Sequence, residues 1–198
     1  MSPAHETLGV VRCDDIAPQP WRNGGGRTRE LLTWPLAGDW LCRISVADIE
    51  RGGPFSSYPG IDRWLVVVEG AGVLLRLPEG VSTRLSSSPP LAFPGEAAPD
   101  CRLLAGPTRD LNLMSLRGRG RASMWRALPD TPWTGPATVR ACFSADPVTL
   151  HRDTADPRLI EPFTLAWSAE STETSWRMQS TVAEPRAWWM SFAIGDDA

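Results

Sequence analysis

Proline restricts this chain more than any other residue, because nineteen prolines recur at short intervals along its 198 residues. Proline lacks a backbone N–H and clashes with the preceding turn of a helix, so long helices are disfavoured throughout. No segment of ten or more residues shows a good helical period. Short apolar segments between Gly, Pro and Ser instead predict an all-β protein, built as a sandwich or barrel with little helix.

The predicted strands are short and differ in how they are buried. Apolar and polar residues alternate over 40–47, which places Arg43 and Ser45 on one face of a strand. Residues 64–68 are continuously apolar and predict a strand buried on both faces. Residues 69–72 then predict a turn into a hairpin with 73–77. Further strands are predicted at 8–12, 29–34, 82–85, 91–93, 101–104, 110–116, 124–128, 138–144, 148–151, 163–167, 176–179 and 188–194.

The composition changes at Gly118, where a stretch rich in Arg and Gly joins two strand-rich parts. Apolar patterning resumes at Met124, so we interpret this stretch as a connection within one body. We therefore expect one unit over 1–198, with a first half at roughly 8–117 and a second at roughly 118–198 that share strands.

The overall composition excludes several classes of protein. The net charge of −3 offers no basic field for nucleic acid. No run of 18 apolar residues could span a membrane, and the N-terminal residues lack a signal-peptide pattern, so a cytoplasmic protein is expected. The four cysteines are widely spaced and contain no C-x-x-C pair, which favours buried free thiols over disulfides. An exposed sheet edge would allow a homodimer, but no pattern requires one.

Histidine is too scarce for the commonest catalytic and metal sites. His5 and His151 are the two histidines, whereas a typical barrel metal site uses two or three imidazoles with a carboxylate. We therefore expect no metal and no other cofactor. The same shortage argues against Ser-His-Asp and Cys-His catalysis, unless His151 acts alone as a base.

Three consecutive glycines, Gly24 to Gly26, follow Trp21 and Asn23. Glycine permits positive φ and lets backbone approach a ligand or another strand closely. The segment is neither a phosphate-binding P-loop nor a dinucleotide fingerprint. Two interpretations stay open, a simple glycine-rich turn and a loop that contacts an anion, and Trp21 is a candidate to line a site beside it.

Polar residues on inward faces of the predicted strands suggest a pocket for a small anion. Arginine's planar fork matches a carboxylate, and Asn can both donate to and accept from an amide or formyl group. A structural alternative is that Arg63 pairs with Asp62 or Asp110 and holds loops to the barrel. The candidates from the residues alone are Trp21, Asn23, Thr28, Arg43, Ser45, Ser56, Arg63, Asp110 and Asn112.

Four segments in this order closely resemble the HutD/Ves family: PWRNGGGRTREL at 20–31, RISVADIERGGPFSSYPGIDR at 43–63, LAFPGE at 91–96 and DLNLMSLR at 110–117. The resemblance implies a bicupin, two jelly-roll barrels packed together in one chain. It also adds Phe55, within the second segment, to the candidate site. The part after Gly118 matches only in its strand-rich character.

The family resemblance implies a role in histidine utilisation, where members are proposed to bind an intermediate such as N-formylglutamate and limit the pathway; Ves-type members are linked to environmental stress. Our first hypothesis is a non-enzymatic sensor of such a carboxylate metabolite. A second is a metal-independent cupin isomerase or lyase with Asp110 or His151 as the base. A third is a structural module in which the motif residues only brace the barrels.

Overall fold

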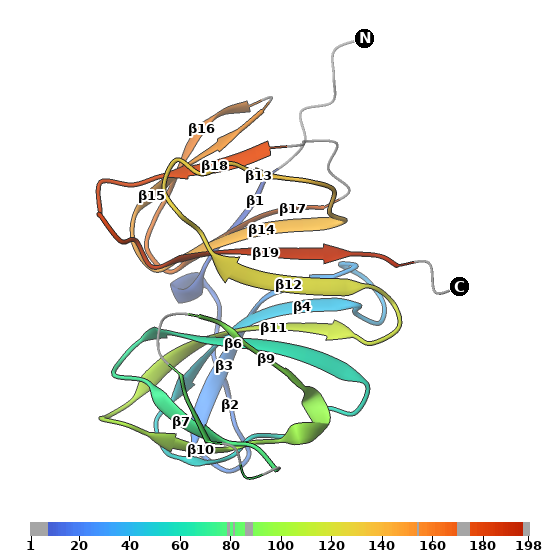
Figure 1. Ribbon diagram of the computed structural model, residues 1–198, viewed down its shortest axis with the longest axis vertical. Helices are drawn as coiled ribbons and strands as arrows, with labels where there is room; N and C mark the ends of the chain where they lie inside the picture. Colours follow the sequence, from blue (N-terminus) through green and yellow to red (C-terminus); the bar gives the residue numbers. More distant parts are fainter. Residues whose placement is uncertain are drawn as a thin grey trace.

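The structure is a computed structural model that describes residues 8–78, 80, 82–85, 89–153, 155–169 and 175–195. This part of the chain forms nineteen β-strands and two short 3-10 helices, η1 (Cys13–Asp15) and η2 (Gly95–Ala97). The all-β prediction is confirmed. Figure 1 shows the strands as two stacked bodies, with the first half of the chain mostly in the lower one.

The lower body consists of a six-stranded and a four-stranded sheet. The larger sheet has the order β2 (Gln19–Pro20), β3 (Gly26–Trp34), β4 (Cys42–Ile49), β11 (Thr108–Leu116), β6 (Ile61–Glu69) and β9 (Leu91–Pro94). The smaller sheet has the order β5 (Gly53–Pro54), β10 (Asp100–Leu103), β7 (Val73–Arg76) and β8 (Ser82–Leu85).

The upper body is built in the same way from a five-stranded and a four-stranded sheet. The larger has the order β1 (Gly9–Arg12), β17 (Thr164–Ala169), β14 (Val139–Ser144), β19 (Ala187–Ala193) and β12 (Arg121–Arg126). The smaller has the order β13 (Trp133–Thr134), β18 (Ser175–Gln179), β15 (Val148–Arg152) and β16 (Ala155–Ile160).

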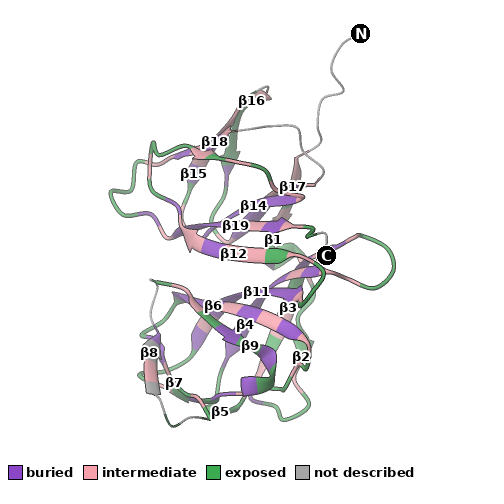
Figure 2. Ribbon diagram, turned by 45° about the vertical axis from the view of Figure 1, so that its right-hand side comes forward, coloured by how far each residue is buried: buried purple, intermediate pink, exposed green. Residues whose placement is uncertain are grey.

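Alternation along the strands explains how the two large sheets meet. In β11, Leu111 and Leu113 face one side, whereas Asp110 and Asn112 face the other. The leucine side packs against the five-stranded sheet, including Phe143 of β14, in a core shared by both bodies. Figure 2 shows this buried layer in purple along the central strands. The other side of β11 faces the interior of the lower body, where a second core lies.

Two features of the chain path differ from the sequence-based expectations. The predicted hairpin of 64–68 with 73–77 is wrong, because β6 pairs with β11 and β9 whereas β7 pairs with β8 and β10. Residues 70–72 instead carry the chain from one sheet to the other. Strand β16 was not predicted, since its exposed residues and Pro157 lack an apolar pattern.

The N-terminal strand lies with the second half of the chain. Strand β1 pairs antiparallel with β17, from Gly9 opposite Trp167 to Arg12 opposite Thr164. The chain therefore runs from the upper body into the lower one and back again. The predicted boundary between the two halves near residue 117 stays a prediction.

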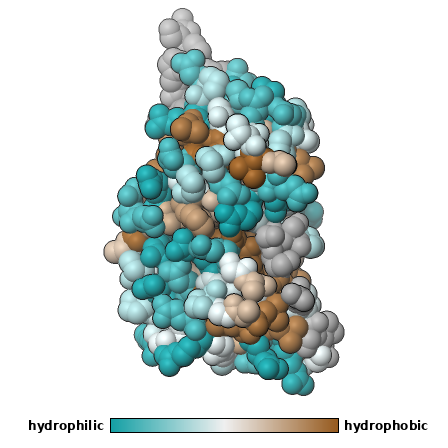
Figure 3. All heavy atoms as spheres, turned by 90° about the vertical axis from the view of Figure 1, so that its left-hand side faces the viewer, coloured by the Kyte–Doolittle hydropathy of each residue, from teal (hydrophilic) through white to brown (hydrophobic). Residues whose placement is uncertain are grey.

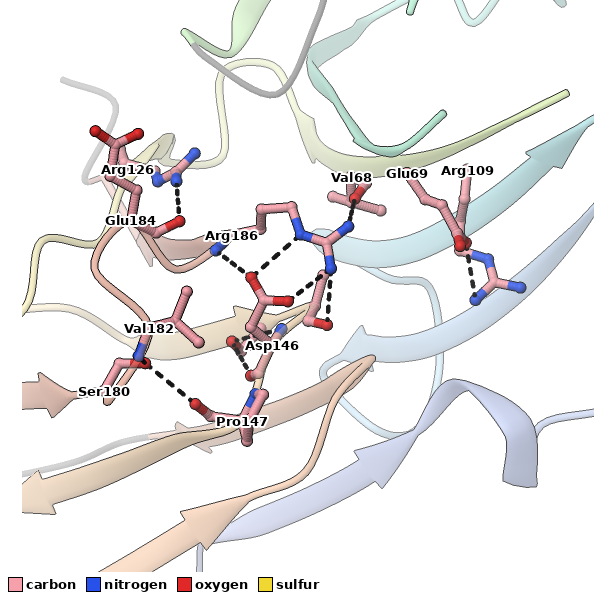
Figure 4. Close-up of polar contacts among 12 residues, drawn as sticks. Val68, Glu69, Arg109, Arg126, Asp146, Pro147, Ser180, Val182, Glu184 and Arg186 are labelled. Atoms are coloured by element: carbon pink, nitrogen blue, oxygen red, sulfur yellow. Dashed lines mark hydrogen bonds and ion pairs between the residues drawn. The ribbon is translucent and has the colours of Figure 1, made fainter. Parts of the chain in front are cut away.

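Polar contacts also join the bodies at one side of the shared core (Figure 4). Arg186, just before β19, donates from Nη1 to the backbone oxygen of Val68 in β6 at 3.1 Å. The same guanidinium pairs with Asp146 at 2.6 Å, which holds the pKa of that carboxyl below its usual range. Arg186 therefore bridges a loop of the upper body to a strand of the lower one.

The outer surface is mixed in character. On the side drawn in Figure 3, apolar residues reach the surface in patches separated by polar residues. The large apolar side chains that are exposed come from different parts of the chain: Val10, Leu36, Leu104, Leu128, Leu159, Val182 and Ile194. Within the described ranges, no helix is long and apolar enough to cross a membrane.

Candidate ligand-binding site

A cavity of about 420 Å³ opens in the lower body, against the inward face of the six-stranded sheet. The structure brings together nine of the ten predicted site residues along its wall. These are Trp21, Asn23, Thr28, Arg43, Ser45, Phe55, Ser56, Arg63 and Asn112. The tenth, Asp110, lies in the same barrel but does not line the cavity.

Strand register explains why residues distant in sequence meet here. Met114 of β11 lies between Arg43 of β4 and Arg63 of β6, its direct partners in the sheet. Two residues earlier on β11, Asn112 lies between Ser45 and Leu65. Because side chains two apart on a strand share a face, both rows point into the barrel. The row with the two arginines forms one end of the polar wall.

Arg63 is the most unusual residue of the cavity. Its side chain is buried, with 6% of the residue exposed, and it donates from Nη2 to Asn112 Oδ1 at 2.9 Å. Its Nε and Nη1 atoms are buried without a hydrogen-bond partner. Among the described residues no carboxylate pairs with it. Burial lowers the pKa of Arg63 to about 10, with a further contribution from Arg43, so the guanidinium is still charged at pH 7.

Aromatic rings surround this guanidinium. The Arg63 Cζ atom lies 5.4 Å from the ring centre of Phe55, 5.5 Å from that of Tyr58 and 5.1 Å from that of Phe93. Rings at these distances stabilise a cation through their quadrupoles but offer no hydrogen-bond acceptor of carboxylate strength. They hold the side chain in place while leaving its charge without a counter-ion.

Arg43 is held differently. Its Nε donates to Glu30 Oε2 at 2.7 Å, and its Nη1 lies 3.8 Å from the sulfur of Met114. Glu30 is not part of the cavity wall, so it neutralises Arg43 from the rim. Arg63 is therefore the buried arginine of this wall whose charge no carboxylate balances, and Arg22 adds an exposed positive charge.

The glycine-rich segment shapes the opposite part of the wall. Trp21 donates from Nε1 to Thr28 Oγ1 at 2.8 Å, which fixes the indole against β3. The Gly25 N–H bonds to Asn23 Oδ1 at 2.9 Å and the Gly24 N–H to the backbone oxygen of Trp21. These two amides are used within the turn. The geometry fits the turn interpretation, in which side chains rather than glycine amides face the cavity.

Asp110 lies deeper in the barrel, beyond the row of Asn112. It is fully buried, and neither carboxylate oxygen has a hydrogen-bond partner. Desolvation raises its pKa from 3.8 to about 7, and the Thr108 hydroxyl, close by but outside hydrogen-bond geometry, offsets only part of that rise. The pairing of Arg63 with Asp62 or Asp110, which was the structural alternative from sequence, is not formed. Asp62 pairs instead with Arg117 at 2.8 Å.

The other groups considered from sequence lie elsewhere. His151 belongs to β15 of the upper body, where its Nε2 lies 2.7 Å from Gln179 Oε1. All four cysteines are buried and unpaired, as predicted. In the part of the chain that the structure describes, no three His, Cys, Asp or Glu side chains gather as a set of metal ligands.

Sequence reasoning missed half of the cavity wall. The additional lining residues are Gln19, Pro20, Arg22, Ala47, Ile49, Pro54, Tyr58, Leu65 and Met114. Strand alternation from Ser45 could have found Ala47 and Ile49, and alternation from Asn112 could have found Met114. Phe93, whose ring covers Arg63, had no sequence signal because it comes from the neighbouring strand β9.

The family model HutD matches residues 13–184, nearly the whole of the described chain. The chain belongs to the HutD/Ves family. A relative from Pseudomonas putida, described as an uncharacterised 21.2 kDa protein in the hutC 3′ region, is 37% identical over 121 residues. Protein Ves of Citrobacter koseri is 36% identical over 115 residues. These matches cover 59% and 56% of this chain and only 63% and 60% of the two relatives.

A longer match supports the same family. Protein Ves of Cronobacter sakazakii is 31% identical over 164 residues, which cover 81% of this chain and 88% of that protein. The structure of HutD from Pseudomonas fluorescens SBW25 is similar with a TM-score of 0.83 and 26% identity, over 96% of this chain and 100% of that one.

A more distant neighbour shows the fold alone. Oxalate decarboxylase of Bacillus subtilis is 10% identical with a TM-score of 0.61, over 99% of this chain and 79% of that one. With this likeness and the paired sheets above, the chain is an all-β bicupin.

Proposed function

We propose that this HutD-family protein is a non-enzymatic binder of a small carboxylate metabolite, and that the cavity of the lower body is its site. The observation that carries the proposal is Arg63, a buried and charged guanidinium with two unpartnered donors and no carboxylate counter-ion. An unpaired charge in a low-dielectric interior is unfavourable. An anion that pairs with Arg63 offsets this cost and therefore stabilises the folded protein.

The rest of the wall fits an anion with a second polar group. Arg22, Arg43 and Arg63 all line the cavity, whereas its wall contains no Asp, Glu, His or Cys among the described residues. Asn112 and Thr28 lie on the same wall and can bond to an amide or formyl group. Carboxylates, imidazoles and thiols are common general bases of enzymes, so a wall without them among the described residues fits binding better than turnover.

We propose N-formylglutamate as the ligand and modulation of histidine utilisation as the role. Two carboxylates and a formyl group match an arginine-rich wall that also carries amide and hydroxyl groups. The Pseudomonas putida relative, described by its place in the hutC 3′ region, supports this assignment. The alternative role in environmental stress is one that the family resemblance implies for Ves-type members. A cytoplasmic location and a homodimer are further predictions.

Calorimetric titration of N-formylglutamate, glutamate and formate into the purified protein tests this proposal. We expect N-formylglutamate to bind and the substitution Arg63→Gln to weaken it at least about tenfold, since a charge-assisted hydrogen bond is lost. The matched control is Arg76→Gln, which removes the same charge from an exposed position of the same barrel. Its affinity should equal that of the unmodified protein.

Thermal unfolding without ligand distinguishes a ligand-binding role of Arg63 from a purely structural role. Because Arg63 has no carboxylate partner, we expect Arg63→Gln to change the free energy of unfolding by no more than about 1 kcal/mol. A much larger loss of stability together with unchanged ligand affinity would contradict the proposal and support a structural role for the motif residues.

A further inference from the structure

Asp110 is a fully buried carboxyl group in the interior of the lower barrel that the proposed site does not use. It projects from β11 on the same face as Asn112 and Met114, which line the cavity. Residues two apart on a strand are separated by roughly 7 Å. Asp110 therefore lies one row below the polar wall, close enough for its charge to act on a ligand without touching it.

The surroundings of Asp110 leave an ionised carboxylate uncompensated. Its partners in the sheet are Ala47 on β4 and Val67 on β6. Val73 and Leu75 of β7 and Cys101 of β10 belong to the same apolar core. Cys101 is the titratable side chain among these neighbours, and burial, with Asp110 adding to the effect, raises its pKa to about 12, so it stays neutral.

The charged groups nearest in sequence cannot serve as counter-ions. Asp48 and Arg109 pair with each other at 2.9 Å on the opposite face of the sheet. Arg63 bonds to Asn112 rather than to Asp110. Both oxygens of Asp110 and the Thr108 hydroxyl beside it lack hydrogen-bond partners.

We infer that Asp110 is a proton-binding site coupled to the cavity above it, so that the protein takes up a proton when it binds a carboxylate. The Arg63 guanidinium bonds to Asn112, two residues along β11 from Asp110, so an anion held there brings negative charge toward an uncompensated buried carboxyl. Added negative charge favours the protonated form of that carboxyl. The step is a proton transfer, in which a hydronium ion or buffer acid in the solvent gives up H⁺ and an O–H bond forms on a carboxylate oxygen of Asp110. This inference rests on the proposed function, because it requires an anion in the cavity.

The consequence is an affinity that depends on pH near neutrality. The pKa of Asp110 without ligand is about 7, so the carboxyl is mostly protonated near pH 6 and mostly ionised near pH 8. Ionisation places a like charge on β11 two residues from Asn112 of the cavity wall, and like charges repel more strongly in a protein interior than in water. We expect carboxylate affinity to fall roughly tenfold between these two pH values.

Calorimetric titration of N-formylglutamate at a series of pH values tests the coupling. The carboxyl groups of this probe titrate near pH 4, so they contribute nothing in the neutral range. Measurements in two buffers with different ionisation enthalpies count the protons taken up. We expect uptake approaching one proton per ligand above about pH 7 in the unmodified protein.

Two variants make the result specific to Asp110. Asp110→Asn imitates the neutral carboxyl, so it should bind with the same affinity across the pH range and without proton uptake. Asp100→Asn removes the same charge from an exposed position of β10 in the same barrel and should keep the pH dependence of the unmodified protein.

The outcomes separate this inference from the proposed function. Binding that depends on Arg63 but is independent of pH and unchanged in Asp110→Asn would overturn the coupling and leave the proposed function in place. Failure of N-formylglutamate, glutamate and formate to bind at any pH would overturn both. Proton uptake that persists in Asp110→Asn would assign it to another group and also refute the inference.

Discussion

Arg63 and Asp110 are buried and face the interior of the lower barrel, and each lacks the partner that usually accompanies buried charge. Arg63 stays charged because its reference pKa is high, and aromatic rings hold it in position. Asp110 responds to the same low dielectric by retaining its proton. Desolvation moves both pKa values toward the neutral form, so the different responses follow from the different starting pKa values of the two groups.

The pH dependence of stability without ligand provides a test at Asp110 itself. Its pKa is raised from 3.8 in the unfolded chain to about 7 in the folded protein. The folded state thus binds the proton more tightly, and the resulting stabilisation is complete below about pH 4 and disappears as pH rises through about 7. The full shift corresponds to roughly 4 kcal/mol.

We expect Asp110→Asn to remove this dependence, because a carboxamide does not titrate. Urea unfolding should find the variant close to the unmodified protein near pH 4 and more stable by a few kcal/mol near pH 8. Parallel stability curves for the two proteins across this range would show that Asp110 is not the group that titrates.

Individual elements owe their positions to close backbone contacts as much as to side chains. A Cβ atom on Gly26 would lie 2.3 Å from the backbone oxygen of Asp48 and 3.2 Å from the Trp21 ring. Strands β3 and β4 can pair at this point because residue 26 has no side chain. The glycine therefore sets the distance between β4 and the tryptophan of the cavity wall.

Gly26→Ala should consequently move β3 away from β4 and lower the free energy of unfolding by about 1–3 kcal/mol, the range typical of overpacking. It should also weaken ligand binding, because Trp21 and Thr28 move with β3. Gly195→Ala is the matched control, since its added Cβ would meet only Gly120 at 3.7 Å. Equal effects of the two substitutions in thermal unfolding would argue against this account of Gly26.

At the scale of the whole molecule, the two barrels are joined by a shared apolar core rather than by a linker alone. Leu113 of β11 and Phe143 of β14 are both fully buried in it, although they belong to different barrels. The Arg186 contact with Val68 adds a polar bridge at its edge. A core of this kind couples the stability of the two halves.

We expect a single cooperative unfolding transition. Leu113→Ala should lower the free energy of unfolding by about 2–5 kcal/mol, and the protein should still unfold in one transition. Leu150→Ala is a useful comparison, because Leu150 is equally buried but lies in the interior of the upper barrel. It too should shift the one transition. Two separate transitions in calorimetry, with each substitution affecting a different one, would show that the barrels unfold independently.

The sequence alone was enough to predict the fold class and half of the residues of the cavity wall. Scattered prolines disfavoured helices, and alternation placed Arg43 and Ser45 on one face of β4 and Asn112 on the inward face of β11. Both signals are local, since they depend on the chemistry of a few consecutive residues. Local patterns also explain why the strand predictions were accurate where one face is buried and failed at the exposed β16.

Only the tertiary structure decided which elements meet. It separated β6 from β7, placed β1 with β17, and brought Phe93 of β9 over Arg63. It also left Arg63 and Asp110 unpaired, although the sequence allowed them to pair with each other. Strand pairing and burial arise from contacts between residues far apart in the chain, so the charge balance of the site follows from the packing of the whole barrel.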